Sequence, residues 1–418
     1  MAGRALRPDH GLTLFKGGES FFPALVEAIE AARVEVLLET YIFEIERSVI
    51  PVAQALANAA ARGVKVCVVV DGVGTGDLPA QWQQRWKAAG VHWSVFNPAR
   101  GWRLLLPKRW RRLHRKLCVV DGTVAFCGGI NLLDDYFDPN HGALDQPRFD
   151  FAVRATGPLV ADMHDTMTRL WARLQVAREA REFDFAGALQ AVRAAARAGT
   201  DMADAGIKGS AAQLEPGGGA ARPRGAQAAL VLRDNVRFRR RIEGTYRVAI
   251  SQAKSEILIA NAYFIPGVQL QRALLRAAKR GVKITLLLQG RYEYFMQYHA
   301  CRAVYGVLLN AGVEIIEYEA SFLHAKVAVM DAANGSIATV GSSNLDPLSL
   351  LLAREANIFV RDDAFAAELR AHLLQAIAQQ GRRVDPDVHR SRTIMPRALS
   401  WVAYALMRMA LFATGKRY

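Results

Sequence analysis

The chain has 418 residues, enough for two or three domains, and about half of them are hydrophobic, which argues against a disordered polypeptide. Its 54 Lys and Arg outnumber its 39 Asp and Glu by 15, so the surface should attract polyanions such as nucleic acid or acidic lipid headgroups. The four cysteines show no CxxC spacing, and we expect neither a zinc site, nor a disulfide framework, nor a cofactor.

The chain contains two copies of one order of segments, and this repeat organises the prediction of its fold. In each copy, helix-like residues lead into a buried strand and a Tyr-containing loop, then into a second helix and strand joined by the pattern RGVK, and then into a third strand that begins at AGV. The matched segments are 27–43 with 248–265, 56–72 with 274–290, and 89–96 with 311–318.

The glycine of each RGVK pattern, Gly63 or Gly281, is interpreted as a helix C-cap that precedes a buried strand. Alternation of helix and strand predicts an α/β fold, built twice, with mostly parallel sheets flanked by helices in each half. The segment 71–77, DGVGTGD, lacks dinucleotide-binding spacing and is interpreted as a turn.

Changes in composition along the chain predict where its domains, linker and tail begin and end. Residues 200–228 are rich in Gly, Ala and Pro without apolar periodicity, and they predict a flexible linker between an N-terminal half, 1–199, and a C-terminal half, 229–395. Residues 396–418 form an apolar tail with basic residues at both ends. We find no signal peptide and no apolar run long enough to predict a clear transmembrane helix.

Each half contains one histidine motif of the form HxKxxxxD, followed by a turn of small residues and an Asn. The first motif supplies His114, Lys116, Asp121 and Asn131, and the second supplies His324, Lys326, Asp331 and Asn344. One HxK alone predicts little, since such a tripeptide is usually a surface strand end. Recurrence within a matched repeat makes a functional site the stronger interpretation.

The spacing of these residues suits phosphodiester chemistry. Side chains two residues apart on a strand share a face, so each motif presents an imidazole beside an ammonium. Two such units supply a nucleophile, a proton donor and cations for the phosphoryl oxygens. Asn131 and Asn344 can donate amide hydrogens to phosphate. Asp121 and Asp331 stand at odd spacing from their histidines, near strand ends, and are interpreted as orienting or structural groups of the catalytic motifs.

The two motifs resemble the signatures of the phospholipase D superfamily, and the layout from about residue 10 to 415 is similar to bacterial cardiolipin synthases, in particular the B type. Besides the motifs, the stretches DFAVRATGPLV and GSSNLDPLSLLLAREANIFV carry this resemblance, while Cys127 departs from the expected pattern. The resemblance implies two pseudo-two-fold-related halves facing each other around one site, with no metal. It also implies that acidic residues, here Asp150 and Glu355, orient the histidines.

In the same way, the resemblance implies that His114 is the nucleophile that forms a phosphohistidine, and that His324 is the general acid and then the base. The implied reaction joins two phosphatidylglycerol molecules into cardiolipin and releases glycerol. A hydrolytic phospholipase D, a nucleic-acid phosphodiesterase and a binding-only protein remain alternatives. The sequence does not indicate the oligomeric state.

The substrate class follows from the residues ahead of His114. The loop 100–113 combines Arg and Lys with Trp102, Trp110 and a run of three leucines, which favours an anionic membrane surface over a nucleic-acid groove. A solvated charged loop is the remaining alternative. The tail 396–418 is interpreted either as an interfacial helix or as a helix packed on the C-terminal half. Together with the resemblance, these features predict anionic phospholipid substrates and a peripheral location on the cytoplasmic face of a bacterial inner membrane.

Overall fold

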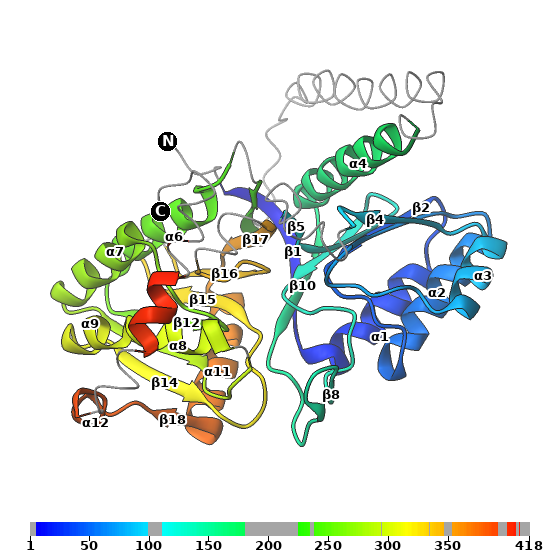
Figure 1. The fold of residues 1–418 in the computed structure, drawn as a ribbon. Coiled ribbons are helices and arrows are strands. Elements are labelled where there is room, and N and C mark those ends of the chain that lie inside the picture. Colours follow the sequence, from blue (N-terminus) through cyan, green and yellow to red (C-terminus); the bar gives the residue numbers. More distant parts are fainter. Residues whose placement is uncertain are drawn as a thin grey trace, which may run out of the picture.

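A computed structural model describes residues 6–98, 111–179, 225–234, 238–293, 295–333, 335–346, 353–391, 399–406 and 409. Two similar halves lie side by side, each a sheet with helices on its outer face (Figure 1). Within the part of the chain that is described, no helix combines the length and apolar character needed to cross a membrane. Most of the loop 100–113, most of the linker and much of the tail lie outside the described residues.

The N-terminal half begins with a long strand and ends with a long helix. Its elements are β1 (Arg7–Lys16), α1 (Gly17–Glu30), β2 (Glu35–Thr40), the short 3-10 helix η1 (Arg47–Val49), α2 (Ile50–Ala61), β3 (Lys65–Asp71), α3 (Ala80–Ala89), β4 (His92–Phe96), β5 (Arg112–Leu113), β6 (Lys116–Val120), β7 (Val124–Gly128), β8 (Phe137–Asp138), β9 (Gly142–Ala143), β10 (Phe151–Thr156) and α4 (Pro158–Glu179).

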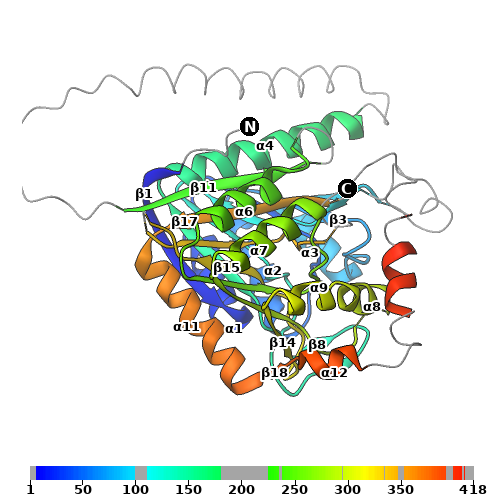
Figure 2. The same cartoon turned by 90° about the vertical axis from the view of Figure 1, so that its left-hand side faces the viewer.

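The C-terminal half repeats this order. Its elements are β11 (Ala226–Arg233), α6 (Arg241–Gln252), β12 (Glu256–Asn261), α7 (Val268–Lys279), β13 (Lys283–Gln289), α8 (Phe295–Ala303), α9 (Tyr305–Asn310), β14 (Glu314–Tyr318), β15 (Lys326–Met330), β16 (Ile337–Gly341), β17 (Ala353–Arg361), α11 (Asp363–Gln380), β18 (Gly381–Arg383) and α12 (Pro386–Arg390). Figure 2 looks onto the outer face of this half, where α6 and α7 lie in front of the sheet.

The strands of both halves form one continuous sheet, in which β1 pairs with β11 and so joins the halves. The expectation of mostly parallel sheets is wrong. Among the strands of the described residues, parallel pairing is confined in each half to three neighbouring strands, β2-β3-β4 and β12-β13-β14, apart from a short pairing of β5 with β17. The motif strands β6 and β7 are joined by residues 121–123, and so short a connection permits only antiparallel pairing.

The predicted helix ends are confirmed. Gly63 and Gly281 directly follow the C-caps of α2 and α7 with φ of 89° and 85°, a left-handed conformation that glycine adopts without steric cost. The buried strands β3 and β13 begin two residues later. The matched segments of the sequence therefore form matched helix-turn-strand units.

A shared hydrophobic core holds the halves together. It joins Leu117 and Val153 of the N-terminal half to Val340 and Ile358 of the C-terminal half, with α4 and α11 contributing to the same cluster. Cys127, the departure from the family pattern, is buried in this core, where its Sγ lies 3.9 Å from the carbonyl oxygen of Ala356. A small apolar side chain therefore suffices at this position.

One predicted boundary differs from the structure. Strand β11 begins at Ala226, inside the predicted linker 200–228, because its pairing with β1 and β17 extends the strand into an Ala-rich segment that has low strand propensity of its own. Residues 399–406 of the tail are helical.

Candidate active site

The two histidines sit at the junction between the halves, each just ahead of its motif strand. Strand β5 of the N-terminal half pairs with β17 of the C-terminal half, and the backbone N–H of His114 donates to the carbonyl oxygen of Arg354 at 3.0 Å. Correspondingly, the backbone N–H of His324 donates to the carbonyl oxygen of Phe149 at 2.9 Å. Each motif is therefore held in place by backbone contacts with the opposite half.

The carboxylates that contact the histidines also come from the opposite half. Nδ1 of His114 lies 3.1 Å from the carboxylate of Glu355, and Nδ1 of His324 lies 2.6 Å from that of Asp150. Both acids are almost completely buried. A carboxylate at Nδ1 favours the tautomer with its proton there, which leaves Nε2 free to act on a substrate. Each catalytic histidine therefore takes its carboxylate partner from the opposite half.

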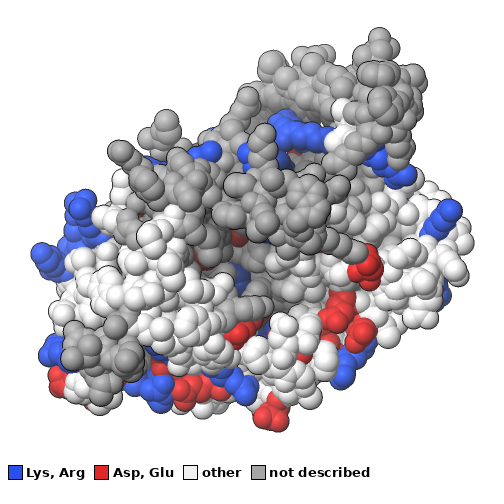
Figure 3. Space-filling view, viewed as in Figure 1, with Lys and Arg blue, Asp and Glu red and all other residues white. Residues whose placement is uncertain are grey.

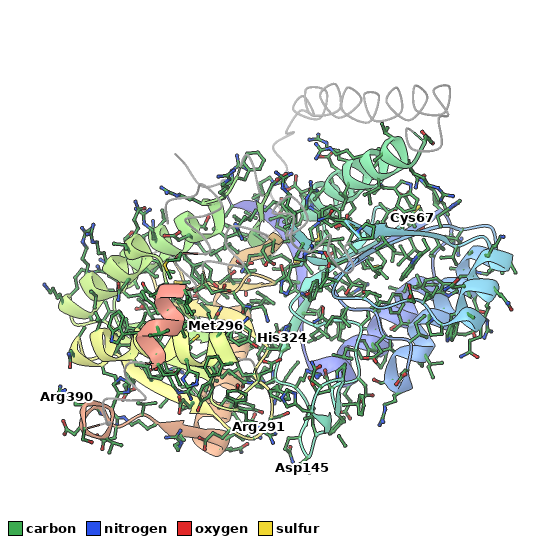
Figure 4. All side chains as sticks on the ribbon, viewed as in Figure 1. Cys67, Asp145, Arg291, Met296, His324 and Arg390 are labelled. Carbon is green, nitrogen blue, oxygen red and sulfur yellow. The ribbon has the colours of Figure 1, made fainter. Side chains whose placement is uncertain are left out.

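A cavity of about 740 Å³ opens between the halves and is lined by His114, His324, Asn131, Asn344 and Asp150. The two predicted asparagines thus lie in the same cavity as both histidines. Figure 4 places the label of His324 between the two halves of the ribbon. The repeated motifs therefore meet in one site, as the sequence predicts.

The two lysines lie buried beneath the histidines. The ammonium of Lys116 donates to the backbone carbonyl of His114 at 2.7 Å, and that of Lys326 donates to the backbone carbonyl of His324. Burial lowers the pKa of Lys116 to about 7, and it also lowers the pKa of Lys326. An anionic phosphodiester entering the cavity would favour the charged form of both lysines.

Burial and nearby cations lower the pKa of both imidazoles. Burial lowers the pKa of His114, although Glu355 opposes this effect, and burial together with Lys326 and Lys116 holds the pKa of His324 well below its usual range. Burial raises the pKa of Asp150 to about 7. These groups lie close enough to titrate as one coupled set.

The motif aspartates Asp121 and Asp331 do not line the cavity. The carboxylate of Asp121 accepts hydrogen bonds of 2.8–2.9 Å from the backbone N–H groups of Arg33, Val34 and Glu35, where β2 begins. Asp331 does the same at the start of β12, with backbone distances of 2.8–3.1 Å. Of the two roles considered for these residues, the contacts favour the structural one.

Two further residues near His114, Tyr41 directly after β2 and Asp71 at the end of β3, were not predicted from the sequence. The ring centroid of Tyr41 lies 4.8 Å from that of His114, and the ammonium of Lys116 lies 5.5 Å from the centre of the tyrosine ring. Asp71, at the end of β3, accepts the backbone N–H of Leu113 at 2.7 Å and so anchors the residue before His114. The signal available was the tyrosine repeated at 41 and 263 in the matched segments.

Comparison with known proteins places this site among related sequences. A family model described as "Cardiolipin synthase, PLD-like domain" matches residues 25–144 and 246–377. Cardiolipin synthase B of Salmonella typhi and that of Escherichia coli K12 are each 34% identical to this chain over 412 residues, which cover 96% of the chain and 89% of the relative. Cardiolipin synthase A of Pseudomonas putida GB-1 is 29% identical over 91% of the chain and 72% of its own length.

Solved structures share the fold at low sequence identity. The phosphatidylserine synthase of Haemophilus influenzae Rd KW20 superimposes with a TM-score of 0.63, at 11% identity, over 98% of this chain and 97% of the other. A polyphosphate kinase from Porphyromonas gingivalis superimposes with a TM-score of 0.54 at 13% identity, over 96% of this chain and 53% of its own.

Proposed function

This chain belongs to the cardiolipin synthase family of PLD-like proteins, and from that premise we propose that it transfers a phosphatidyl group between phospholipids, converting two phosphatidylglycerol molecules into cardiolipin and glycerol. The observation that carries the proposal is the pair of crossed histidine-carboxylate contacts, His114 with Glu355 and His324 with Asp150, in one cavity. Such a site can both attack a phosphodiester and protonate its leaving group.

The reaction proceeds in two displacements. Nε2 of His114 attacks the phosphorus of the first lipid, the bond from phosphorus to the glycerol headgroup oxygen breaks, and His324 donates a proton to that oxygen. The headgroup hydroxyl of the second lipid then gives its proton back to His324 while its oxygen attacks phosphorus, and the phosphorus-nitrogen bond breaks. The assignment of nucleophile and acid follows the family resemblance. Trapping of the phosphohistidine tests this assignment. The intermediate should be absent from the His114→Ala variant, which lacks the proposed nucleophile, but not from the His324→Ala variant.

The surrounding residues stabilise charge rather than take part in bond changes. Ammonium groups of Lys116 and Lys326 offset the negative charge of the phosphoryl oxygens, and the side chains of Asn131 and Asn344 donate hydrogen bonds to them. Asp150 and Glu355 stabilise the imidazolium forms.

The helix of residues 399–406, red in Figure 1, supports a membrane location, because it is packed on one face and apolar on the other. Ala403 is buried against Ile265 and Cys301, whereas Trp401 and Leu406 are 55% and 45% exposed. Exposed aromatic and aliphatic side chains on a helix suit the headgroup boundary of a bilayer. We therefore propose peripheral binding to anionic membranes, on the cytoplasmic face of a bacterial inner membrane.

Product analysis tests the proposed reaction. The protein is incubated with vesicles that contain phosphatidylglycerol labelled in its phosphate, and the lipid products are separated. The proposal expects labelled cardiolipin together with free glycerol. Phosphatidic acid without cardiolipin would instead identify a hydrolase.

A further inference from the structure

The wall of the catalytic cavity is acidic, although the proposed substrates are anionic. Besides Asp150, seven carboxylate residues line it, and Arg148 is the one lysine or arginine among the described residues that do so. Figure 3 shows Asp and Glu gathered around the hollow between the halves. The lining acids are Glu44, Glu46, Asp77, Asp135, Asp138, Glu293 and Asp346.

Not all of these acids are available to a ligand. Asp138 is already occupied, since it pairs with Arg148 and accepts from Nδ1 of His141 at 2.9 Å. Glu44 differs, because its Oε2 is buried and has no hydrogen-bond partner in the described part of the chain. Burial raises the pKa of Glu44, and nearby Glu46 adds to this effect. A hydrogen-bond donor that enters the cavity can satisfy this acceptor.

Glu293 lies on the loop after β13 and accepts a hydrogen bond from the hydroxyl of Tyr263. Burial raises its pKa as well. Its charge influences the pKa of Lys326, so it lies within electrostatic reach of the catalytic centre. Glu293 and His324 also line the same cavity, so a group bound to Glu293 shares that cavity with a catalytic histidine.

Asn344 provides an independent sign that a hydrogen-bond donor binds here. It is 5% exposed and lines the same cavity, and its Oδ1 has no hydrogen-bond partner among the described residues. A buried acceptor without a partner costs free energy, and a ligand that donates to it recovers that cost. A neutral amide oxygen beside carboxylates suits hydroxyl groups.

We propose that Glu44, Glu293 and Asn344 form a polyol subsite that binds the hydroxyl groups of the glycerol headgroup, first on the leaving glycerol and then on the acceptor lipid. This inference rests on the proposed function and identifies the residues that select the headgroup. The acidic wall repels the phosphate of the acceptor lipid, so only its uncharged glycerol end enters.

Hydroxyl groups can also bind the carboxyl groups of the wall in either protonation state. A hydroxyl can donate to an ionised carboxylate and can accept from a protonated one, so it binds carboxyls whose pKa values are raised. Held there, the headgroup oxygen can face the phosphorus while the other hydroxyls are bound. Water lacks these additional contacts, which favours transfer over hydrolysis.

Glycerol exchange tests the subsite without requiring cardiolipin formation. Labelled glycerol is added to the protein with vesicles of phosphatidylglycerol, and its incorporation into the lipid is measured. In this step the glycerol oxygen bonds to phosphorus, the phosphorus-histidine bond breaks and the hydroxyl proton passes to the second histidine. We compare the parent protein with Glu44→Gln, Glu293→Gln and, as a control, Glu30→Gln, an exposed residue of α1.

We expect the KM for glycerol to rise about tenfold or more in Glu44→Gln and in Glu293→Gln, with a matching fall in the ratio of exchange to hydrolysis. Glu30→Gln should behave like the parent protein. Thermal melting of each variant shows whether it is folded, and the two single variants give separate tests.

Four results would overturn the inference. Two concern the variants: an unchanged glycerol KM in both folded cavity variants, or an equal rise of the KM in the control. The other two concern the parent protein: no glycerol exchange although it forms cardiolipin, or strong competition by ethanolamine, which would indicate an ammonium subsite. By contrast, a parent protein that exchanges glycerol with the expected variant effects but forms no cardiolipin would defeat the proposed function and leave the polyol subsite standing.

Discussion

Replacing Glu355 by Gln removes one negative charge from the completely buried contact with His114 while preserving the shape of the side chain. At this 3.1 Å contact, charge centres about 4 Å apart in a medium of effective dielectric about 20 attract each other by ~4 kcal/mol. The glutamine amide recovers part of this attraction. We therefore expect kcat to fall by about 10²- to 10³-fold. Burial and the loss of Glu355 both lower the pKa of His114, so its imidazolium form becomes harder to reach.

The measurement is the initial rate of product formation from labelled phosphatidylglycerol in vesicles, with thermal melting to confirm folding. Glu243→Gln is the matched control, because Glu243 is also buried but lies on α6 and does not line the cavity. Burial raises the pKa of Glu243, so a neutral amide suits that position, and the variant should keep the parent rate. A folded Glu355→Gln variant with a rate within threefold of the parent would show that the charge of Glu355 does not contribute to catalysis as expected.

Further outcomes follow from the same contacts. Asp150→Asn should lower kcat by at least about 10²-fold, and by NMR it should perturb the titration of His324 more than that of the other catalytic histidine, since the pairing crosses between the halves. The plot of kcat/KM against pH should peak near neutrality, because Asp150 ionises as the pH rises through about 7 while Lys116 loses its proton there. A flat profile from about pH 5.5 to about pH 8.5 would contradict this expectation. Asp121→Ala should lower the free energy of unfolding by about 1–2 kcal/mol in denaturant titrations yet keep kcat within threefold, because its carboxylate serves backbone N–H groups. Leu406→Ser should weaken flotation with anionic vesicles, whereas Val388→Ser, equally apolar and 64% exposed on α12, should not.

The repeat allowed much of the fold to be predicted, because helix ends and buried strands are local features. Gly63 and Gly281 end helices by a backbone conformation that depends on the residue itself. The HxK spacing was less informative about side-chain direction, because each histidine lies just ahead of its motif strand, which begins at the lysine. The pairing direction of the strands is not a local feature of this kind. The sequence pattern of β6 and β7 does not distinguish parallel from antiparallel pairing unless the short turn between them is weighed.

The crossed pairing within the site could not be predicted from chain order. Asp150 follows His114 in the sequence, and Glu355 follows His324, yet each acid contacts the histidine of the other half. This pairing depends on how two separate halves pack, and no local pattern encodes it. The acids Glu44 and Glu293 escaped notice for a similar reason, since they lie on loops far from either motif in sequence and meet only in the folded cavity.

The central claim is that two repeated motifs form one catalytic centre with one nucleophilic histidine. The most direct test is to mix the protein with vesicles of labelled phosphatidylglycerol, quench the reaction and measure the label bound per chain. We expect at most one acid-labile phosphatidyl group per chain, attached to histidine and absent in His114→Ala. Two labelled histidines per chain would contradict it, as would turnover without any covalent intermediate.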